Sequence, residues 1–501
     1  MTAATTAGPA PETATPPGPE PATPAWRLAL PGIAIGLVGA LVGLGRLSLW
    51  LDESLSLGAT NQLAATLRGT GGTMAAYYAV LTPWTAVSEA VWWLRLLSTL
   101  FALASLLPLA ALARRIGGDV LAVRAAAFAG GAVAFTRYAQ EARSYSLVML
   151  LTATAMWVAV RAIEVGPGRD RPWWRLSLLL GALLVLSHGL GLLAVGAIAV
   201  ALVLAPERDR ALRGYAPTVV AAGALVALLW SAGADEVGAW VPSIDGDQLR
   251  ALVTTFVSPA WWAAVPLLAA VAGGGVLAWR SGAATDHDRW LARLPVVWLT
   301  IPTVGLVLLS LVRPSLLDRY LIGIVPAVAL LLAGATVNLD GRLTGRPARV
   351  VGPAALLVAA LLMVGQVEVH RRTGDDWRAA AEVVAADARS GDGLLFAQQY
   401  HRTPFEAGWQ ELDHPTPAPQ PVDSPRPLGT VRRHDPPRSD DEVDTALAEH
   451  DRVWLVTAHE PGEDGDALAH LLERPGIRDR FTVVRTTELR GTVEVLLLEA
   501  H

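Results

Sequence analysis

The stretch WRLALPGIAIGLVGALVGLGRLSLWLDES occupies residues 26–54 and decides the class of fold. Its apolar part, from about Trp26 to Trp50, is long enough to cross a bilayer core, which takes about 20 residues of helix. Two adjacent carboxylates, Asp52 and Glu53, follow at one end of it. The sequence therefore predicts a membrane-spanning helix that ends in an acidic motif at the water interface.

Residues 1–25, which precede this helix, consist mainly of Thr, Pro, Ala and Gly. Such a segment buries too little apolar surface to fold, so we expect a disordered cytoplasmic tail. It lacks the basic region and the short apolar region of a cleaved signal peptide, so we interpret the first span as retained.

Apolar runs of similar length recur along most of the chain. Of the 501 residues, 52% are hydrophobic and only 17% are charged, which is too apolar for an ordinary soluble enzyme. We expect a multi-pass α-helical membrane domain over residues 26–368 with about eleven spans. After 26–50, these lie near 91–112, 120–136, 143–161, 174–187, 189–205, 215–233, 256–279, 294–312, 320–338 and 350–367.

Arginines gather in every second loop between these spans, and short cytoplasmic loops are the ones that accumulate basic residues. They are Arg114 and Arg115; Arg161, Arg169, Arg171 and Arg175; Arg208, Arg210 and Arg213; Arg280, Arg289 and Arg293; and Arg342, Arg346 and Arg349. This alternation predicts a plasma-membrane protein with its N-terminus inside. It places Asp52, the segment 140–145, His188, residues 318–320 and the tail from about 370 outside.

The tail, residues 369–501, is more polar and is expected to form a small extracytoplasmic α/β domain. A Pro-rich segment at 412–440 reads as a linker or long loop. Helices are expected at 375–389, 441–449 and 466–472, and strands at 393–397, 452–457, 481–484 and 492–499.

Several classes of chemistry lack the residues they need. The chain has no Cys, which excludes disulfides, thiolate metal sites and cysteine nucleophiles. It contains no Lys, no long basic tract and no GxxxxGK[ST] or HExxH motif. A nucleic-acid partner, nucleotide chemistry and zinc-protease chemistry are therefore not expected.

Asp52 and Glu53 allow two interpretations. They can simply end the helix, with Trp50 as an interfacial anchor. Alternatively, one carboxylate acts as general base, accepting a proton from an acceptor hydroxyl that attacks a sugar carbon, while its neighbour holds the acceptor or a cation. No ligand spacing motivates a metal here, so no cofactor is certain and a divalent cation stays open.

A second polar cluster contains Arg137, Gln140, Glu141, Arg143 and Tyr145. Ionisable groups at membrane depth usually pair with each other or face a cavity, so a structural ion pair between Glu141 and an Arg is one interpretation. The other is a phosphate clamp, because guanidinium groups present a rigid fork of donors that suits a phosphate.

Two further outer-face features carry similar alternatives. His188 is either a satisfied helix-end histidine or a residue that contacts substrate or metal. In the cluster Arg313, Asp318, Arg319 and Tyr320, Asp318 can pair with an Arg of the same cluster and Tyr320 can belong to an aromatic belt.

In order and spacing, these features resemble the multi-span glycosyltransferases of family 39 and their bacterial relatives, which include protein mannosyltransferases and aminoarabinose transferases and have the GT-C fold. The matching landmarks are Trp50–Ser54 (WLDES), Tyr77 and Tyr78, Ser88 and Glu89, Leu94 and Arg95, Ala113–Gly117 (ARRIG), Tyr138–Ser146 (YAQEARSYS), Arg319–Leu321 with Pro326, and Asp376–Arg378. The chain departs from the pattern at Thr73–Ala76 and Thr82, where many relatives carry other elements before and after the paired tyrosines. This departure leaves acceptor binding undetermined.

The resemblance implies a polyprenyl-phosphate sugar donor, transfer with inversion, Asp52 as the leading base and outer-face arginines at the donor phosphate. We accordingly expect a cell-envelope glycosyltransferase with an extracytoplasmic acceptor. Its catalytic residues would be Asp52 and Glu53, and its phosphate-binding residues Arg137, Arg143 and Arg319. Substrate would also be lined by Tyr78, Gln140, Glu141, Tyr145, His188 and Tyr320. The alternatives are a membrane transporter or lipid flippase, whose charges would lie within the spans, and a sensor or scaffold, in which Asp52 could be replaced without loss.

Overall fold

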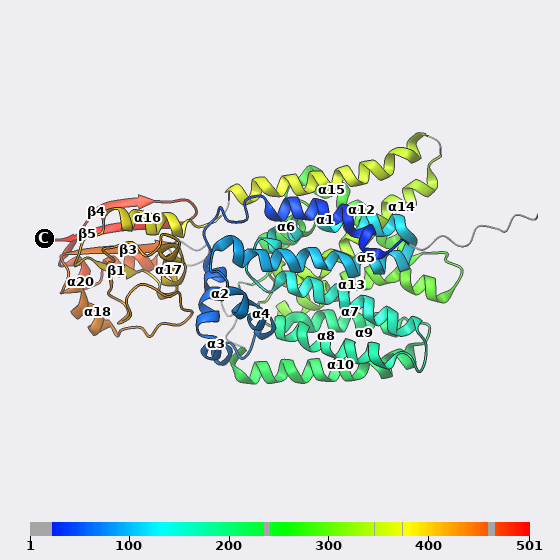
Figure 1. Cartoon of the computed structure of the whole chain (residues 1–501), viewed down its shortest axis with the longest axis horizontal. Coiled ribbons are helices and arrows are strands. Elements are labelled where there is room, and N and C mark those ends of the chain that lie inside the picture. Colours follow the sequence, from blue (N-terminus) through cyan, green and yellow to red (C-terminus); the bar gives the residue numbers. More distant parts are fainter. Residues whose placement is uncertain (1–22, 235–240, 242, 345, 373, 459–465) are drawn as a thin grey trace, which may run out of the picture.

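The computed structural model describes residues 23–501 apart from 235–240, 242, 345, 373 and 459–465. Most of the tail expected at 1–25 lies outside the described residues. Figure 1 shows a bundle of helices, here called the helical part (residues 23–372), with a small sheet and its helices beyond one end of it. This second assembly, residues 374–501, is called the C-terminal unit.

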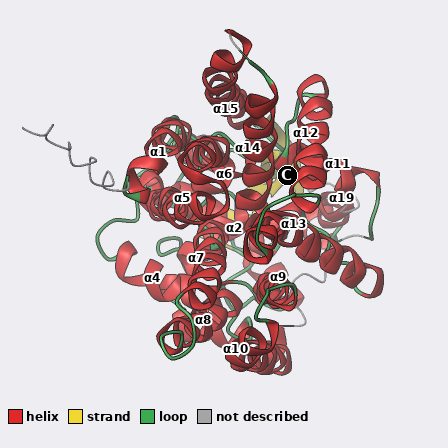
Figure 2. Ribbon diagram, turned by 90° about the vertical axis from the view of Figure 1, so that its right-hand side faces the viewer, coloured by secondary structure: helices red, strands yellow, loops and turns green. Residues whose placement is uncertain are grey.

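The helical part contains long helices that run side by side along the bundle, seen end-on in Figure 2, together with several short ones. They are α1 (Ala25–Leu41), α2 (Leu51–Asn61), α3 (Leu63–Gly69), α4 (Ala75–Thr85), α5 (Val91–Gly130), α6 (Val133–Ala139), α7 (Tyr145–Glu164), α8 (Arg171–Ser187), η1 (Gly189–Gly191), α9 (Leu192–Val203), α10 (Arg208–Leu229), η2 (Trp230–Ala234), α11 (Gly246–Phe256), α12 (Trp261–Trp279), α13 (Asp286–Val312), η3 (Asp318–Ile324), α14 (Val325–Arg342) and α15 (Arg346–Arg372).

Helix α5 is broken at its middle. Gly117 and Gly118 leave the helical conformation, and Gly118 has a φ of +79°, which glycine adopts without steric cost. The chain turns back there. A hydrogen bond shows this, since the Thr99 hydroxyl donates to the Ala139 carbonyl at 2.8 Å. A straight helix of that length would separate these residues by about 60 Å. The break falls between the spans expected at 91–112 and 120–136.

Among the described residues, six helices are long and apolar enough to cross a membrane: Val91–Gly130, Tyr145–Glu164, Arg208–Gly233, Trp261–Trp279, Asp286–Val312 and Asp318–Arg342. Other expected spans, such as Ala25–Leu41, Gly189–Val203 and Arg349–Met363, form shorter apolar helices. The expectation of about eleven spans is therefore not confirmed as a number, although a helical membrane architecture is.

The arginine-rich loops meet at the end of the bundle that lies away from the C-terminal unit. Arg115 pairs with Glu164 at 2.7 Å, and Arg210 pairs with Asp170 at 3.0 Å. His287, in the first turn of α13, also lies 3.9 Å from Glu164. Loops that are distant in sequence thus share one face, as the alternation of arginines predicts.

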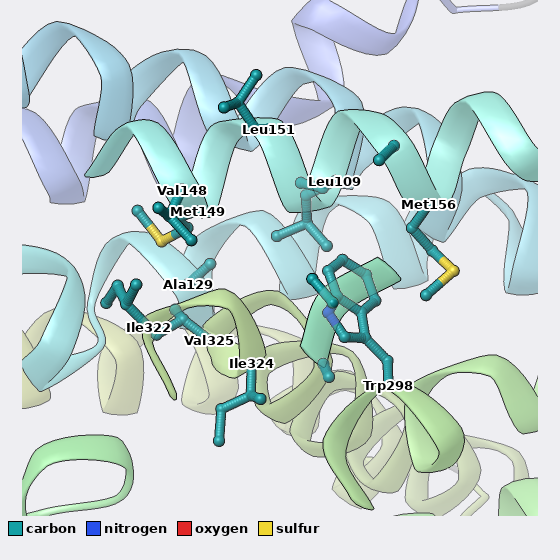
Figure 3. Packing of buried hydrophobic residues seen from close by; sticks show 14 of the residues in the cluster. Leu109, Ala129, Val148, Met149, Leu151, Met156, Trp298, Ile322, Ile324 and Val325 are labelled. Atoms are coloured by element: carbon teal, nitrogen blue, oxygen red, sulfur yellow. The ribbon is translucent and has the colours of Figure 1, made fainter. Parts of the chain in front are cut away.

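The core of the helical part is apolar and closely packed. Figure 3 shows Val148 and Met149 of α7 above Ile322 of η3, and Trp298 of α13 further along on the side of Met156. All five side chains are buried. In such a core, association rests on close packing of side chains rather than on a difference in hydrophobicity from the lipid.

Glycines allow a close helix contact between α1 and the second half of α5. A Cβ on Gly32 would lie 2.2 Å from the Ala126 carbonyl oxygen, and one on Gly130 would lie 2.2 Å from the Gly32 oxygen. The two backbones therefore touch at these residues, which is the use that small residues have in membrane helix packing.

Replacing Gly32 with Val is expected to push α1 away from α5 and to destabilise the protein by about 1–3 kcal/mol or more, as overpacking does. The measurement is the midpoint of thermal unfolding in detergent. Gly196→Ala on α9 is the control, because a Cβ there meets no atom within 4 Å. An unchanged midpoint for Gly32→Val would show that the α1–α5 contact is dispensable.

The C-terminal unit is built around a five-stranded sheet with the order β2-β1-β3-β5-β4. Its elements are α16 (Trp377–Asp387), β1 (Gly393–Phe396), η4 (Gln399–His401), α17 (Arg402–Glu411), β2 (Gln420–Pro421), α18 (Asp440–Leu447), β3 (Arg452–Ala458), α19 (Asp466–Leu472), α20 (Pro475–Arg478), β4 (Phe481–Glu488) and β5 (Val493–Ala500). β1 pairs in parallel with β2 and β3, and β5 pairs antiparallel with β3 and β4.

The strands expected at 393–397, 452–457, 481–484 and 492–499 correspond to β1, β3, β4 and β5. The elements that were not expected are η4, the helices α17 and α20, and the short strand β2, which lies inside the segment expected to be a linker. The region expected as an outer loop after Leu51 also forms helices, α2 to α4. Their runs are short and mixed in polarity, so hydropathy alone does not reveal them.

The two parts are joined by side-chain contacts at this end of the bundle. The Ser48 hydroxyl donates to the Asp375 carbonyl at 3.0 Å, and Gln410 of α17 donates to the Glu89 carboxylate. The C-terminal unit therefore covers the end of the bundle from which α2 projects (Figure 1).

Candidate active site

Asp52 and Glu53 lie in the first turn of α2, where the unpaired backbone N–H groups favour negative charge. Trp50 precedes the helix, and its backbone N–H donates to the Glu53 carboxylate at 3.4 Å. The two neighbouring acids point to different partners, so they have different environments although they are adjacent in sequence.

Glu53 is 1% exposed and is fully engaged. It accepts hydrogen bonds from Arg95 Nε at 2.8 Å and Nη2 at 2.6 Å, and from the Ala142 N–H at 2.8 Å. Arg95 also donates to the carbonyls of Leu44, Leu47 and Ser48. This buried ion pair ties the end of α1, the start of α5 and the 140–144 loop to α2, and it fixes the position of Asp52.

Asp52 is less enclosed, with 20% of its side chain exposed. Its carboxylate lies 3.7 Å from Arg143 Nη2 and 4.0 Å from Arg319 Nη2. Arg143 also donates to the Asp52 carbonyl at 3.1 Å and to Ser56 Oγ at 3.2 Å. Within the described residues, no hydrogen bond occupies the Asp52 carboxylate, so it can accept one from a substrate.

Arg319 reaches this point from η3, far along the sequence. Its guanidinium carbon lies 5.7 Å from the centre of the Trp50 ring, within the range of a cation–π contact. The sequence-predicted residues Asp52, Arg143 and Arg319 are therefore brought together.

Arg137 pairs elsewhere, with Glu141 at 3.4 Å and Asp318 at 3.5 Å. The Asp318 carboxylate also accepts hydrogen bonds from the Thr255 hydroxyl and the Arg319 N–H. The ion pair anticipated for Glu141 is thus present, and Asp318 pairs with Arg137 of the other polar cluster. Arg137 nevertheless keeps 40% of its side chain exposed, so it is still accessible to a ligand.

Gln140 is buried and donates to the carbonyls of Gly39 at 2.8 Å and Val42 at 2.9 Å. These acceptors lie at the C-terminal end of α1, whose last carbonyls have no partner within the helix. Gln140 therefore caps α1 and holds the 140–144 loop against it.

Three rings line a small cavity beside Arg319. The His188 ring centre lies 4.7 Å from that of Tyr320 and 6.4 Å from that of Tyr145. The cavity, which these residues and Arg319 line, has a volume of about 20 Å³, which is room for one water molecule. His188 Nδ1 accepts a hydrogen bond from the Leu190 N–H at 3.2 Å, as expected of a histidine at a helix end.

Tyr78 of α4 is buried, and its hydroxyl contacts Met74 Sδ at 3.6 Å. Its neighbour Tyr77 contacts Ser98 Oγ at 3.4 Å. Tyr77 thus links α4 to α5 close to Arg143, whose carbonyl accepts from Ser98 at 3.2 Å.

A larger cavity of about 390 Å³ opens at the junction with the C-terminal unit. Leu49, Glu89, Trp92, Arg378 and Glu411 contribute to its lining. Arg378 lies 3.7 Å from Glu411, and burial raises the pKa of Glu411 to about 7, although Arg378 lowers it in part. Sequence reasoning did not single out this cavity, because its residues come from separate segments.

The raised pKa of Glu411 predicts a pH-dependent stability. The folded state binds this proton more tightly than the unfolded state, whose carboxyl titrates near 4.5. This contribution to stability is therefore full below about pH 4.5 and is lost as the pH rises through about 7, by roughly 2–3 kcal/mol.

Glu411→Gln should accordingly raise the thermal midpoint above that of the wild type at pH 8 and leave the two close at pH 5. Glu382→Gln serves as the control, because Glu382 also pairs with Arg378 but is 54% exposed. Parallel pH profiles for wild type and Glu411→Gln would contradict the assignment.

Among the residues that the structure describes, no group of three or more His, Asp or Glu side chains is placed to hold a metal ion. The described residues therefore provide no set of ligands for the divalent cation that the sequence analysis considered.

The fold of this chain is similar to that of several solved structures. The fold matches the crystal structure of ArnT from Cupriavidus metallidurans in the apo state, with a TM-score of 0.57 and 16% identity over 94% of this chain and 98% of that chain. It also matches ArnT bound to undecaprenyl phosphate, with a TM-score of 0.54, 15% identity and coverage of 93% and 97%.

A third match is the archaeal oligosaccharyltransferase AglB from Archaeoglobus fulgidus, in complex with an inhibitory peptide and a dolichol-phosphate. Its TM-score is 0.55 at 10% identity, over 94% of this chain and 74% of that one. No family model and no curated protein matches the sequence. ArnT and AglB are both GT-C proteins, and this chain has the GT-C fold of membrane glycosyltransferases.

Proposed function

We propose that this chain is an inverting glycosyltransferase that moves a sugar from a polyprenyl-phosphate donor to an acceptor on the extracytoplasmic face of the plasma membrane. The observation that carries the proposal is the Asp52 carboxylate, which has no hydrogen bond within the described residues and lies 3.7 and 4.0 Å from two guanidinium groups. A base next to a pair of cations is what transfer from a lipid phosphate requires, because the phosphate leaves without a general acid.

In the proposed reaction, Asp52 accepts the proton of an acceptor hydroxyl as its oxygen attacks the anomeric carbon of the sugar. The bond between that carbon and the phosphate oxygen breaks, and the lipid phosphate keeps the electron pair. Attack from the face opposite the leaving group inverts the configuration. Arg143 and Arg319 balance the charge that develops on the phosphate, and no other reactant is needed.

The remaining predicted residues take supporting roles. Glu53 positions Asp52 through its bonds to Arg95 and Ala142, rather than touching substrate. Arg137, with its exposed side chain, extends the cationic face toward the donor. Tyr145, His188 and Tyr320 form the wall beside Arg319, Tyr78 packs α4 close to Arg143, and Gln140 and Glu141 hold the loop that carries Arg143.

The location of the site supports the proposed orientation. The arginine-rich loops lie at one end of the bundle and Asp52 lies at the other, beneath the C-terminal unit. With the basic end in the cytoplasm, Asp52 and the C-terminal unit are outside. The solved structures that hold undecaprenyl phosphate and dolichol-phosphate are consistent with a lipid-phosphate donor. No observation on the described residues favours the transporter alternative.

The test is sugar transfer in membranes that contain the protein, from a set of radiolabelled polyprenyl-phosphate sugars to endogenous acceptors. The expected result is label in lipid, glycan or protein that is absent from membranes without the protein. Failure with every donor, while the protein is folded and abundant, would remove the proposed activity. The sugar and the acceptor would be identified from the labelled product.

A further inference from the structure

A segment of the C-terminal unit, residues 431–434, lies directly on α2. The Asn61 side chain donates to the Val431 carbonyl at 3.0 Å. The Gln62 side-chain oxygen accepts from the backbone N–H groups of Arg433 at 3.1 Å and His434 at 3.0 Å, and its amide donates to the His434 carbonyl at 3.0 Å. Polar side chains at the C-terminal end of α2, Asn61 and the capping residue Gln62, thus fix the backbone of this segment on both sides of Arg433.

Gly58 allows the backbone of residues 431–434 to lie against α2. A Cβ at Gly58 would lie 2.5 Å from the Arg433 backbone nitrogen, so the segment touches the helix backbone there. Gly58 follows Ser56 on α2, and Ser56 Oγ accepts from Arg143 at 3.2 Å. The segment therefore crosses α2 next to the residues that surround Asp52.

A network of ion pairs within the C-terminal unit also holds residues 431–434. Arg426 pairs with Glu406 at 2.5 Å and with Asp435 at 2.7 Å, and Arg402 lies 3.4 Å from Asp435. The Thr403 hydroxyl donates to the Arg432 carbonyl at 3.1 Å. Residues on both sides of Arg433 are thus anchored in α17 and its neighbouring loop.

The Arg433 side chain has no carboxylate partner among the described residues, and its buried Nε has no hydrogen-bond acceptor there. Burial, together with the nearby Arg143, lowers the pKa of its guanidinium, while Tyr78 and Asp52 raise it. These three residues are the charged or titratable groups that act on Arg433 from α2, α4 and the 140–144 loop. The Nε of Arg143 is likewise buried without an acceptor.

Buried donors without acceptors are costly, and two such donors beside Asp52 indicate an anion that binds between them. Arg143 and Arg433 both interact with the single Asp52 carboxylate, and Arg433 has no carboxylate partner of its own among the described residues, which leaves a positive charge to be balanced. A phosphate monoester carries close to two negative charges at pH 7, whereas a phosphodiester carries one.

We propose that Arg433 is a further phosphate-binding residue of this site, contributed by the C-terminal unit, and that it favours the lipid phosphate monoester released on sugar transfer over the diester donor. This inference rests on the proposed function. It assigns the C-terminal unit a direct part in the reaction, because Arg433 would stabilise the charge that appears only as the sugar leaves.

The test measures binding of two soluble probes to the purified full chain at one pH: farnesyl phosphate, a monoester, and its methyl ester, a diester. Arg433→Gln is expected to weaken monoester binding about tenfold and diester binding about two- to threefold, because a charge-assisted contact is lost. Arg432→Gln, next in sequence with an exposed side chain, is expected to bind both probes like the wild type. Arg433→Lys, which keeps the charge, should recover part of the monoester affinity.

The outcomes separate the two levels of inference. If wild type binds the monoester and Arg433→Gln binds it equally well, Arg433 is not a phosphate ligand, while the proposed transfer stands. Equal weakening of both probes overturns the preference for the released monoester. If the wild type binds neither probe, both this inference and the proposed function fail. Matching thermal midpoints of wild type and Arg433→Gln would show that reduced binding is not a folding defect.

Discussion

Replacing Asp52 with Asn is expected to lower sugar transfer by about 10²- to 10⁴-fold, the usual contribution of a general base. Asparagine has nearly the same shape but cannot accept the proton of the acceptor hydroxyl. The carboxylate has no hydrogen bond within the described residues, so its replacement leaves no buried donor without an acceptor. The folded structure should therefore persist, and the loss should fall on the rate of transfer rather than on protein abundance.

The measurement is transfer of radiolabelled sugar with protein levels matched by immunoblot. Asp247→Asn is the matched control, because Asp247 lies on α11 with 83% of its side chain exposed and pairs only with Arg250 among the described residues. Equal transfer by wild type and Asp52→Asn would show that Asp52 is not the base. Absence of transfer in both proteins, with every donor tried, would instead favour a transporter or a scaffold.

Replacing Glu53 with Gln is expected to destabilise the protein by about 3–5 kcal/mol, because it leaves the Arg95 guanidinium buried without its counter-ion. The pair is almost inaccessible, with side-chain exposures of 1% for Glu53 and 7% for Arg95. The same substitution also weakens the bond from Ala142 and loosens the 140–144 loop. Transfer should therefore fall together with stability, unlike the effect of Asp52→Asn.

Thermal unfolding in detergent measures this effect. The double variant Glu53→Gln with Arg95→Met removes both charges, and it should recover much of the lost stability, since replacing a whole buried pair is far less costly than breaking it. Asp247→Asn again provides the control, since an exposed pair contributes little. A Glu53→Gln midpoint equal to that of the wild type would mean that the ion pair does not hold the site together.

The adjacent acids show how far sequence reasoning reaches. The motif at residues 50–54 indicated one base and a neighbouring acid that holds the acceptor or a cation, and the structure gives the two carboxylates different surroundings. Which acid takes which surroundings depends on Arg95, Arg143 and Arg319, which lie 42, 91 and 267 residues away from their partners. No local pattern encodes those pairings, because they arise when separate helices pack.

The same limit applies to the C-terminal segment. The proline-rich composition of 412–440 predicted a linker, and the sequence contains no regular pattern that would reveal its contacts. The structure places residues 431–434 of that segment on α2, through Asn61, Gln62 and the space above Gly58. A contact across about 370 residues depends on how the C-terminal unit sits on the bundle, so only the folded chain reveals it.

The sequence by itself determined the helical membrane class, the GT-C resemblance, the clustering of basic loops at one end and the main strands of the C-terminal unit. These follow from hydropathy, arginine distribution and short-range periodicity, which are local properties of the chain. Tertiary structure alone decided that α5 turns back at Gly117 and Gly118, that Glu53 is bound by Arg95 while Asp52 lacks a hydrogen bond among the described residues, and that Arg433 approaches the site. These depend on distances between residues remote in sequence, and such distances are set by packing rather than by composition.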